Sequence, residues 1–114
     1  MRMIRYQAKA AQAAANEQLV RAVFDELHST QPAGLSYAVY RLADEVTFVH
    51  LVDTAGPGQS SPLLAVKAFG EFQAGHGDRC DQPPVAEELK ELGRYQNGLV
   101  SPFAVYPSRQ PSQR

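Results

Sequence analysis

The sequence has no tryptophan, one cysteine and almost no net charge, and each shortage excludes a class of protein. Cys80 alone cannot form an internal disulfide or the paired-cysteine motif of redox and zinc sites. Eleven Lys and Arg against twelve Asp and Glu give a net charge of −1, too small a field to attract nucleic acid. No apolar run approaches the roughly 20 residues of a membrane helix, and residues 1–15 lack the apolar core of a signal peptide. We therefore expect a cytoplasmic protein with no nucleic-acid or membrane partner.

The 114 residues do contain enough apolar material for one domain. Hydrophobic residues make up 44% and charged residues 20%, as in ordinary globular proteins. A chain of this length can bury about two-thirds of its unfolded surface. We expect a domain over residues 1–96 and a C-terminal extension over residues 97–114. The apolar part of this extension, residues 99–106, should dock on the domain or on a second subunit, and its polar end should be disordered.

Hydrophobic patterning predicts six elements in the domain. Residues 3–7 alternate as a strand does, and residues 10–27 are good helix formers with apolar residues on one side. Residues 35–42 and 46–52 predict an antiparallel hairpin, after which a turn-rich loop at residues 56–62 should be exposed and mobile. Residues 64–80 have helical spacing, but their glycines predict a short or irregular helix. Residues 85–95 fit a helix or a strand; we assign a strand, because a fourth strand completes a sheet and Gly93 suits a helix interior poorly.

The order β-α-β-β-α-β predicts an α+β, ferredoxin-like fold, with a four-stranded antiparallel sheet and two helices on one face. Such a sheet leaves its other face open. The hairpin nevertheless carries apolar residues on both faces, Phe48 and Val52 on one and Val49 and Leu51 on the other. An apolar open face needs a second cover, and another copy of the chain is the simplest one. The pattern therefore predicts a homodimer.

Several phrases also resemble a known family. They are Met-Ile-Arg-Tyr in the first strand, Leu-Val-Arg-Ala-Val-Phe-Asp-Glu-Leu in the first helix, Gly-Leu-Ser-Tyr-Ala-Val-Tyr-Arg-Leu and Val-Thr-Phe-Val-His-Leu in the hairpin, and Ala-Phe-Gly-Glu-Phe-Gln-Ala-Gly in the second helix. Over about residues 1–96 the chain resembles the dimeric α/β-barrel superfamily, and within it the antibiotic-biosynthesis-monooxygenase-like small proteins. The resemblance implies a homodimer whose two sheets face each other. It also implies one of three functions: a cofactor-independent oxygenase of phenols or quinols, a haem-degrading oxygenase, or a member with no assigned activity.

The haem-degrading branch is the one that the residues argue against. Its members use an Asn on the first strand, a core Trp and a His on the second helix as the haem ligand. His76 falls near the position of that His, but the chain has no Trp and offers Gln7 on the first strand. His76 and Cys80 have the i, i+4 spacing of metal ligands, yet no third ligand shares their face. We therefore expect neither a metal nor a cofactor.

His50 is the candidate catalytic residue, because it lies in an apolar strand on the side of Phe48. A buried His needs a hydrogen-bond partner, and its titration near neutral pH suits it to act as a base. The possible partners lie on the neighbouring strands: Tyr6, Tyr37, Tyr40 and Arg41. The other interpretation is a structural histidine of the core or interface whose hydrogen bonds are all satisfied. The sequence alone leaves both interpretations open.

Two functions from different classes follow. In the first, the chain is a cofactor-independent monooxygenase of a phenol or quinol, with His50 as the base. The residues expected to hold the substrate are Tyr37, Arg41, Asn16, Tyr6 and His76. Asn16 lies on the apolar side of the first helix and fits either a helix-start cap or a group pointing into the cavity. In the second, the chain is a non-catalytic dimeric module that binds a small aromatic or apolar ligand, or is purely structural.

Overall fold

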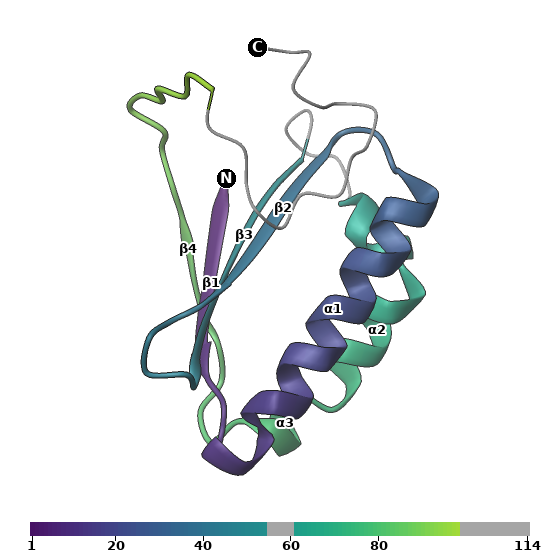
Figure 1. The fold of residues 1–114 in the computed structure, drawn as a ribbon, viewed down its shortest axis with the longest axis vertical. Helices are drawn as coiled ribbons and strands as arrows, with labels where there is room; N and C mark the ends of the chain where they lie inside the picture. Colours follow the sequence, from purple (N-terminus) through teal and green to yellow (C-terminus); the bar gives the residue numbers. More distant parts are fainter. Residues whose placement is uncertain (55–60, 99–114) are drawn as a thin grey trace.

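The computed structural model describes residues 1–54 and 61–98, which form a four-stranded antiparallel sheet with helices on one face (Figure 1). The strands are β1 (Arg2–Gln7), β2 (Leu35–Arg41), β3 (Thr47–Thr54) and β4 (Val85–Glu88), in the spatial order β2-β3-β1-β4. The long helix α1 (Ala13–Thr30) and the shorter α2 (Lys67–Ala74) lie side by side over this sheet. The predicted α+β, ferredoxin-like fold is confirmed.

The first helix begins three residues later than its composition predicts. Residues Ala10–Gln12 form a 3-10 turn, and α1 runs from Ala13 to Thr30. The helix ends where Gln31 adopts a left-handed conformation and donates its backbone N–H to the carbonyl of Leu27. Pro32 then prevents continuation, and Gly34, with a positive φ of 77°, turns the chain into β2.

The register of the central strands decides which side chains face the helices. His50 of β3 lies opposite Ile4 of β1 and opposite Val39 of β2. Alternate residues share a face, so His50 lies on the side of Tyr6 and Tyr37. This is the side that the helices cover. The pattern of the hairpin thus places its histidine in the interior between sheet and helices.

The second helical region is divided, as its glycines predict. A 3-10 turn at Pro62–Ala65 is followed by α2 and then by the short helix α3 (His76–Arg79), which begins after Gly75. Glu26 of α1 fixes the start of α2, because its carboxylate accepts hydrogen bonds from the backbone N–H groups of Lys67 and Ala68. Cys80 lies beyond α3, and its backbone forms an isolated antiparallel β-bridge with Ala8, which follows β1.

The predicted fourth strand is too long. Only Val85–Glu88 pair with β1, and residues 89–95 continue outside the sheet. Exposed Gly93 sits in this part. The expected docking of residues 99–106, the disorder of the polar end and most of the predicted mobile loop at residues 56–62 lie outside the described residues. Among those that are described, no helix is both long and apolar enough to cross a membrane.

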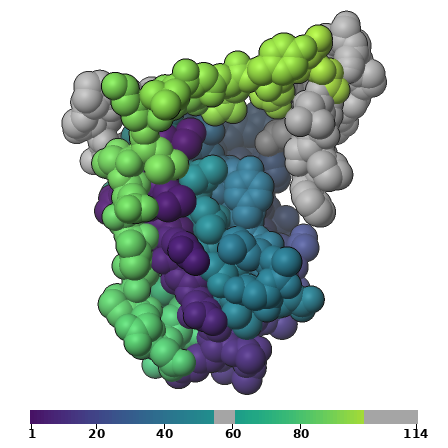
Figure 2. Space-filling model, turned by 90° about the vertical axis from the view of Figure 1, so that its left-hand side faces the viewer, coloured from purple at the N-terminus to yellow at the C-terminus, as the bar shows by residue number. Residues whose placement is uncertain are grey.

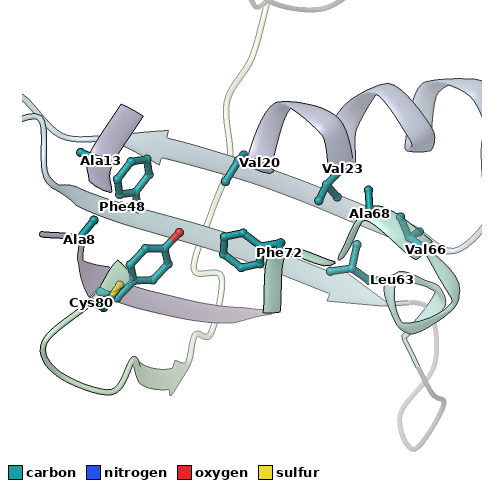
Figure 3. Packing of buried hydrophobic residues seen from close by; sticks show 11 residues of the cluster. Ala8, Ala13, Val20, Val23, Phe48, Leu63, Val66, Ala68, Phe72 and Cys80 are labelled. Carbon is teal, nitrogen blue, oxygen red and sulfur yellow. The ribbon is translucent and has the colours of Figure 1, made fainter. Parts of the chain in front are cut away.

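The core fills the space between the sheet and the helices (Figure 3). Phe48 and Val23 are each 1% exposed, and Phe72 of α2 packs beside them. None of the described helices covers the other face of the sheet, onto which Figure 2 looks. Several apolar side chains on this open face are only partly buried or exposed: Met3, Ala38, Tyr40, Val49, Leu51 and Val85. We call these six residues the open-face patch.

Candidate functional site

A pocket of about 290 Å³ lies between the sheet and the second helical region. Its apolar wall is formed mainly by aliphatic and aromatic side chains of β1, β3, α2 and the preceding turn: Ile4, Val52, Leu63, Phe69, Phe72 and Pro84. Its polar groups are Tyr6, Tyr37, His50, Gln73 and His76. The volume is near the lower end for ligand sites, so it suits a molecule of one or two rings.

His50 lies between two tyrosines in this pocket. Its Nε2 is 2.8 Å from the Tyr6 hydroxyl oxygen, and its Nδ1 is 2.8 Å from the Tyr37 hydroxyl oxygen. The side chain of His50 is 3% exposed and its ring packs on Phe72, with 5.4 Å between the ring centroids. Both imidazole nitrogens are therefore engaged with neutral phenol groups.

The hydrogen bonds continue from Tyr6 into the core. The Asn16 side-chain amide donates to the Tyr6 hydroxyl oxygen at 2.8 Å, and Arg79 Nε donates to Asn16 Oδ1 at 2.9 Å. Arg79 also donates to the backbone carbonyl of Phe72. Asn16 is 0% exposed and Arg79 is 6% exposed. A continuous buried chain of side chains thus joins a guanidinium to the pocket; we call Arg79, Asn16, Tyr6, His50 and Tyr37 the relay.

Burial keeps the relay uncharged except at its arginine end. Loss of solvent lowers the pKa of His50 to about 4, with a smaller contribution from the nearby His76. Burial also raises the pKa of the Tyr6 and Tyr37 hydroxyls. At neutral pH the imidazole and both phenols are therefore neutral, so the polar end of the pocket offers hydrogen-bonding groups that carry no charge.

His76 and Cys80 lie beside Tyr6 and contact each other. His76 Nε2 is 3.7 Å from Cys80 Sγ, and its ring meets the Tyr6 ring edge-on at a centroid distance of 4.4 Å. Burial raises the pKa of the Cys80 thiol, which disfavours the thiolate. In residues 1–54 and 61–98, no group of three or more His, Cys, Asp or Glu side chains could hold a metal ion.

The structure brings most of the expected site residues together. Tyr6, Tyr37, His50 and His76 line the pocket. Asn16 does not line it but lies behind Tyr6. The cap interpretation of Asn16 is wrong, because the N-cap of α1 is Gln12 and the Asn16 side chain faces the interior.

Arg41 lies apart from the pocket. Its guanidinium donates to the Glu17 carboxylate at 2.7 Å and to the backbone carbonyl of Glu45, on the solvent side of Phe48. The Glu17 carboxylate is held between Arg41 and Arg21, whose hydrogen bonds lower its pKa. This position at the end of β2 makes Arg41 a surface ion-pair residue in the structure.

Arg79, which anchors the relay, was not among the residues predicted from the sequence. The residue follows Phe72 by seven positions, the spacing of one helix face, and this was the available signal. The break at Gly75 interrupts that helix, so the spacing alone could not show that the guanidinium turns inward. The helical spacing of residues 64–80 likewise gave no sign that Phe69 and Phe72 form part of the pocket wall.

Comparison with known proteins gives a fold and no sequence family. No family model matches the chain, and no curated protein matches it. Among solved structures, Rv0793 from Mycobacterium tuberculosis has a TM-score of 0.65 at 17% identity, with 83% of this chain and 96% of that chain covered. A "putative antibiotic biosynthesis monooxygenase" from Nitrosomonas europaea has a TM-score of 0.65 at 13% identity, covering 80% and 88%.

A third structure, named in the same way, comes from Caulobacter crescentus CB15 and has a TM-score of 0.58 at 19% identity, covering 81% of this chain and 88% of that chain. Identities this low establish a shared fold only. The reaction has to be inferred from the residues of the site. In its fold, the chain resembles the antibiotic-biosynthesis-monooxygenase-like proteins.

Proposed function

We propose that the pocket binds a one- or two-ring phenol or quinol, and that the chain oxidises it as a cofactor-independent monooxygenase. The observation that carries this proposal is the placement of Tyr37 and His50 at the polar end of an otherwise apolar, aromatic-walled pocket. Phe69 and Phe72 offer ring surfaces to an aromatic ligand, and the tyrosine hydroxyl can bond its oxygen. Solved structures of the same fold include proteins named as monooxygenases.

The reaction needs only the substrate and dioxygen. In the keto tautomer of a phenol, one ring carbon carries two hydrogens, and the anion of this compound can give electrons to dioxygen. Dioxygen would bond to that carbon and take up one proton to give a hydroperoxide. Loss of water then breaks the O–O bond and the remaining C–H bond, so that one oxygen atom becomes the carbonyl of that carbon and the other leaves as water. The phenol is oxidised to a quinone and dioxygen is reduced, so that phenol plus dioxygen gives quinone plus water.

The residues of the pocket would promote this reaction by holding the substrate anion. A base whose pKa is about 4 removes a phenolic proton only weakly, so His50 would act mainly through the Tyr37 hydroxyl. The apolar wall would exclude water from the ring carbon that meets dioxygen. The phenolic proton would leave through the mouth of the pocket, which is partly open to solvent.

The first prediction tests this function with 1-naphthol, which has two rings and one phenolic oxygen. The protein should accelerate dioxygen uptake by 1-naphthol, and His50→Ala should lower this rate about tenfold, the scale of the hydrogen bond that orients the Tyr37 hydroxyl. His50→Gln should retain the fold but not the rate. An oxygen electrode gives the rate, and Gln18→Ala on the exposed side of α1 is the matched control.

The non-catalytic alternative has a specific observation in its favour. Both nitrogens of His50 are engaged with neutral partners and its pKa is low, an arrangement that suits binding as well as turnover. If 1-naphthol binds, as judged by its fluorescence, and no dioxygen is consumed, the chain is a binding module and not an oxygenase.

We also propose that the chain is a homodimer formed through the open-face patch. Tyr40 and Val85 of this patch are 55% and 62% exposed, and beyond β4 the side chains of Leu92 and Tyr95 are 90% and 87% exposed. Apolar surface of this kind on a small domain favours burial against a second copy.

The second prediction concerns this dimer. Light scattering after size exclusion should give a mass of about 25 kDa, twice the 12.5 kDa of the chain. Leu51→Lys, which places a charge at the centre of the patch, should give a folded monomer. Ala22→Lys on the exposed side of α1 should remain dimeric. A monomeric wild-type protein would contradict the proposal.

A further inference from the structure

The relay has a direction, and the direction is set by Arg79. A guanidinium can only donate hydrogen bonds, so the atom of Asn16 that lies 2.9 Å from Arg79 Nε must be the carbonyl oxygen, Oδ1. The amide nitrogen then points the other way and donates to the Tyr6 hydroxyl oxygen. A flipped Asn16 would place two donors against each other. Arg79 therefore fixes the orientation of this amide.

The next two hydrogen bonds follow from the first. The Tyr6 oxygen already accepts from Asn16, and the acceptor within reach of its own proton is His50 Nε2, at 2.8 Å. If Nε2 carried a proton instead, the Tyr6 hydroxyl would be a buried donor, 5% exposed, with no acceptor among the described residues. Nε2 is therefore the acceptor, and the single proton of the neutral imidazole lies on Nδ1.

The relay ends at Tyr37, in the pocket. Since His50 Nδ1 carries a proton, it donates to the Tyr37 oxygen. The Tyr37 hydroxyl must therefore donate its own hydrogen bond to a different acceptor. No other protein acceptor for it exists in the described parts of the chain, and Tyr37 lines the pocket. The polar end of the pocket thus presents an O–H group that has no acceptor among residues 1–54 and 61–98.

We infer that this pocket selects ligands whose oxygen accepts a hydrogen bond, namely aromatic ring ketones and phenolates, and that Tyr37 is the donor to that oxygen. The inference rests on the proposed function for the place of the ligand, and adds which form of the ligand is bound. Asn16 and Arg79 are positioning residues in this scheme, because they touch no ligand and act by orienting the proton of Tyr37.

Asn16→Asp should reverse the relay without altering the pocket wall. A carboxylate at this position accepts from both Arg79 and Tyr6, so that Tyr6 then accepts from His50 Nε2. His50 Nδ1 becomes an acceptor for the Tyr37 proton, and Tyr37 offers only a lone pair to the ligand. The new carboxylate also pairs with the Arg79 guanidinium, which supports retention of the fold.

The test compares 1-tetralone, which has a ring carbonyl, with tetralin, the same two rings without oxygen. Asn16→Asp should weaken the binding of 1-tetralone about tenfold, the scale of one hydrogen bond, and should leave tetralin unchanged. Tyr37→Phe should show the same loss. Calorimetric titration of both ligands measures these affinities, and Asp25→Asn on exposed α1 is the control for a charge change on the same helix.

The outcomes separate the two proposals. If 1-tetralone binds the wild type and Asn16→Asp equally well, the directional relay is wrong while the aromatic pocket stands. If neither ligand binds the wild type, the pocket itself is not a ligand site and both proposals fall. Should Asn16→Asp not fold, nitrogen-15 NMR of the wild type decides, because the inference requires a proton on Nδ1 of His50 and none on Nε2.

Discussion

Asn16→Ala is expected to lower the free energy of unfolding by about 3 kcal/mol. The Asn16 side chain is fully buried and bonds Arg79 on one side and Tyr6 on the other. Its removal leaves a charged donor and a phenol oxygen without their partner, and each buried group left unpaired costs roughly 1–3 kcal/mol. Urea denaturation followed by circular dichroism measures the change. Gln18→Ala, on the exposed side of the same helix, should change the free energy by less than about 0.5 kcal/mol.

A second variant shows whether the loss comes from the relay. Arg79→Met removes the buried guanidinium, so Asn16→Ala should cost distinctly less in that background than in the wild type. Equal costs in both backgrounds would mean that Asn16 stabilises the protein through something other than Arg79. A loss of less than about 1 kcal/mol in the single variant would mean that water replaces the amide without penalty.

The alternation of the strands was sufficient to identify His50 as the candidate centre of the site. It left Tyr6, Tyr37, Tyr40 and Arg41 as possible partners, and the register of the sheet selects Tyr6 and Tyr37. Arg41 shares the face of Tyr37 by alternation but lies at the strand end, where Glu17 and Glu45 draw its guanidinium outward. The register between strands is needed to separate these cases, and a single sequence does not contain it.

The relay beyond Tyr6 could not be predicted, because it depends on how helices pack on the sheet. From the sequence, Asn16 could be a helix cap. In the structure the 3-10 turn at residues 10–12 leads directly into α1, so Asn16 lies inside the helix. Arg79 is a charged residue in a glycine-rich segment, and such residues are usually at the surface. Its burial requires the break in the helix at Gly75. It also requires the backbone carbonyl of Phe72, which accepts a hydrogen bond from the guanidinium. These are features of tertiary structure.

Acidification from pH 7 to pH 4 is expected to remove about 3 kcal/mol of stability through His50 alone. The pKa of His50 is about 4 in the folded protein, against about 6.5 in the unfolded chain, because burial disfavours the imidazolium. The unfolded chain therefore binds a proton at a pH where the folded protein does not. The stabilising contribution is complete above pH 6.5 and is lost progressively as the pH falls toward 4. Burial also lowers the pKa of His76, which adds a loss of the same sign.

Urea denaturation at a series of pH values between 7 and 4 tests this prediction against two matched variants. His50→Gln should be less stable at pH 7 but should lose less stability on acidification, because glutamine keeps a hydrogen bond and does not titrate. Gln18→Ala, a change on the exposed side of α1 that removes no titratable group, should keep the wild-type dependence on pH. The difference between the two variants isolates the buried imidazole from the carboxylates that titrate below pH 5. If His50→Gln and wild type lose stability in parallel, His50 takes up its proton without disturbing the fold, and the relay is looser than its distances imply.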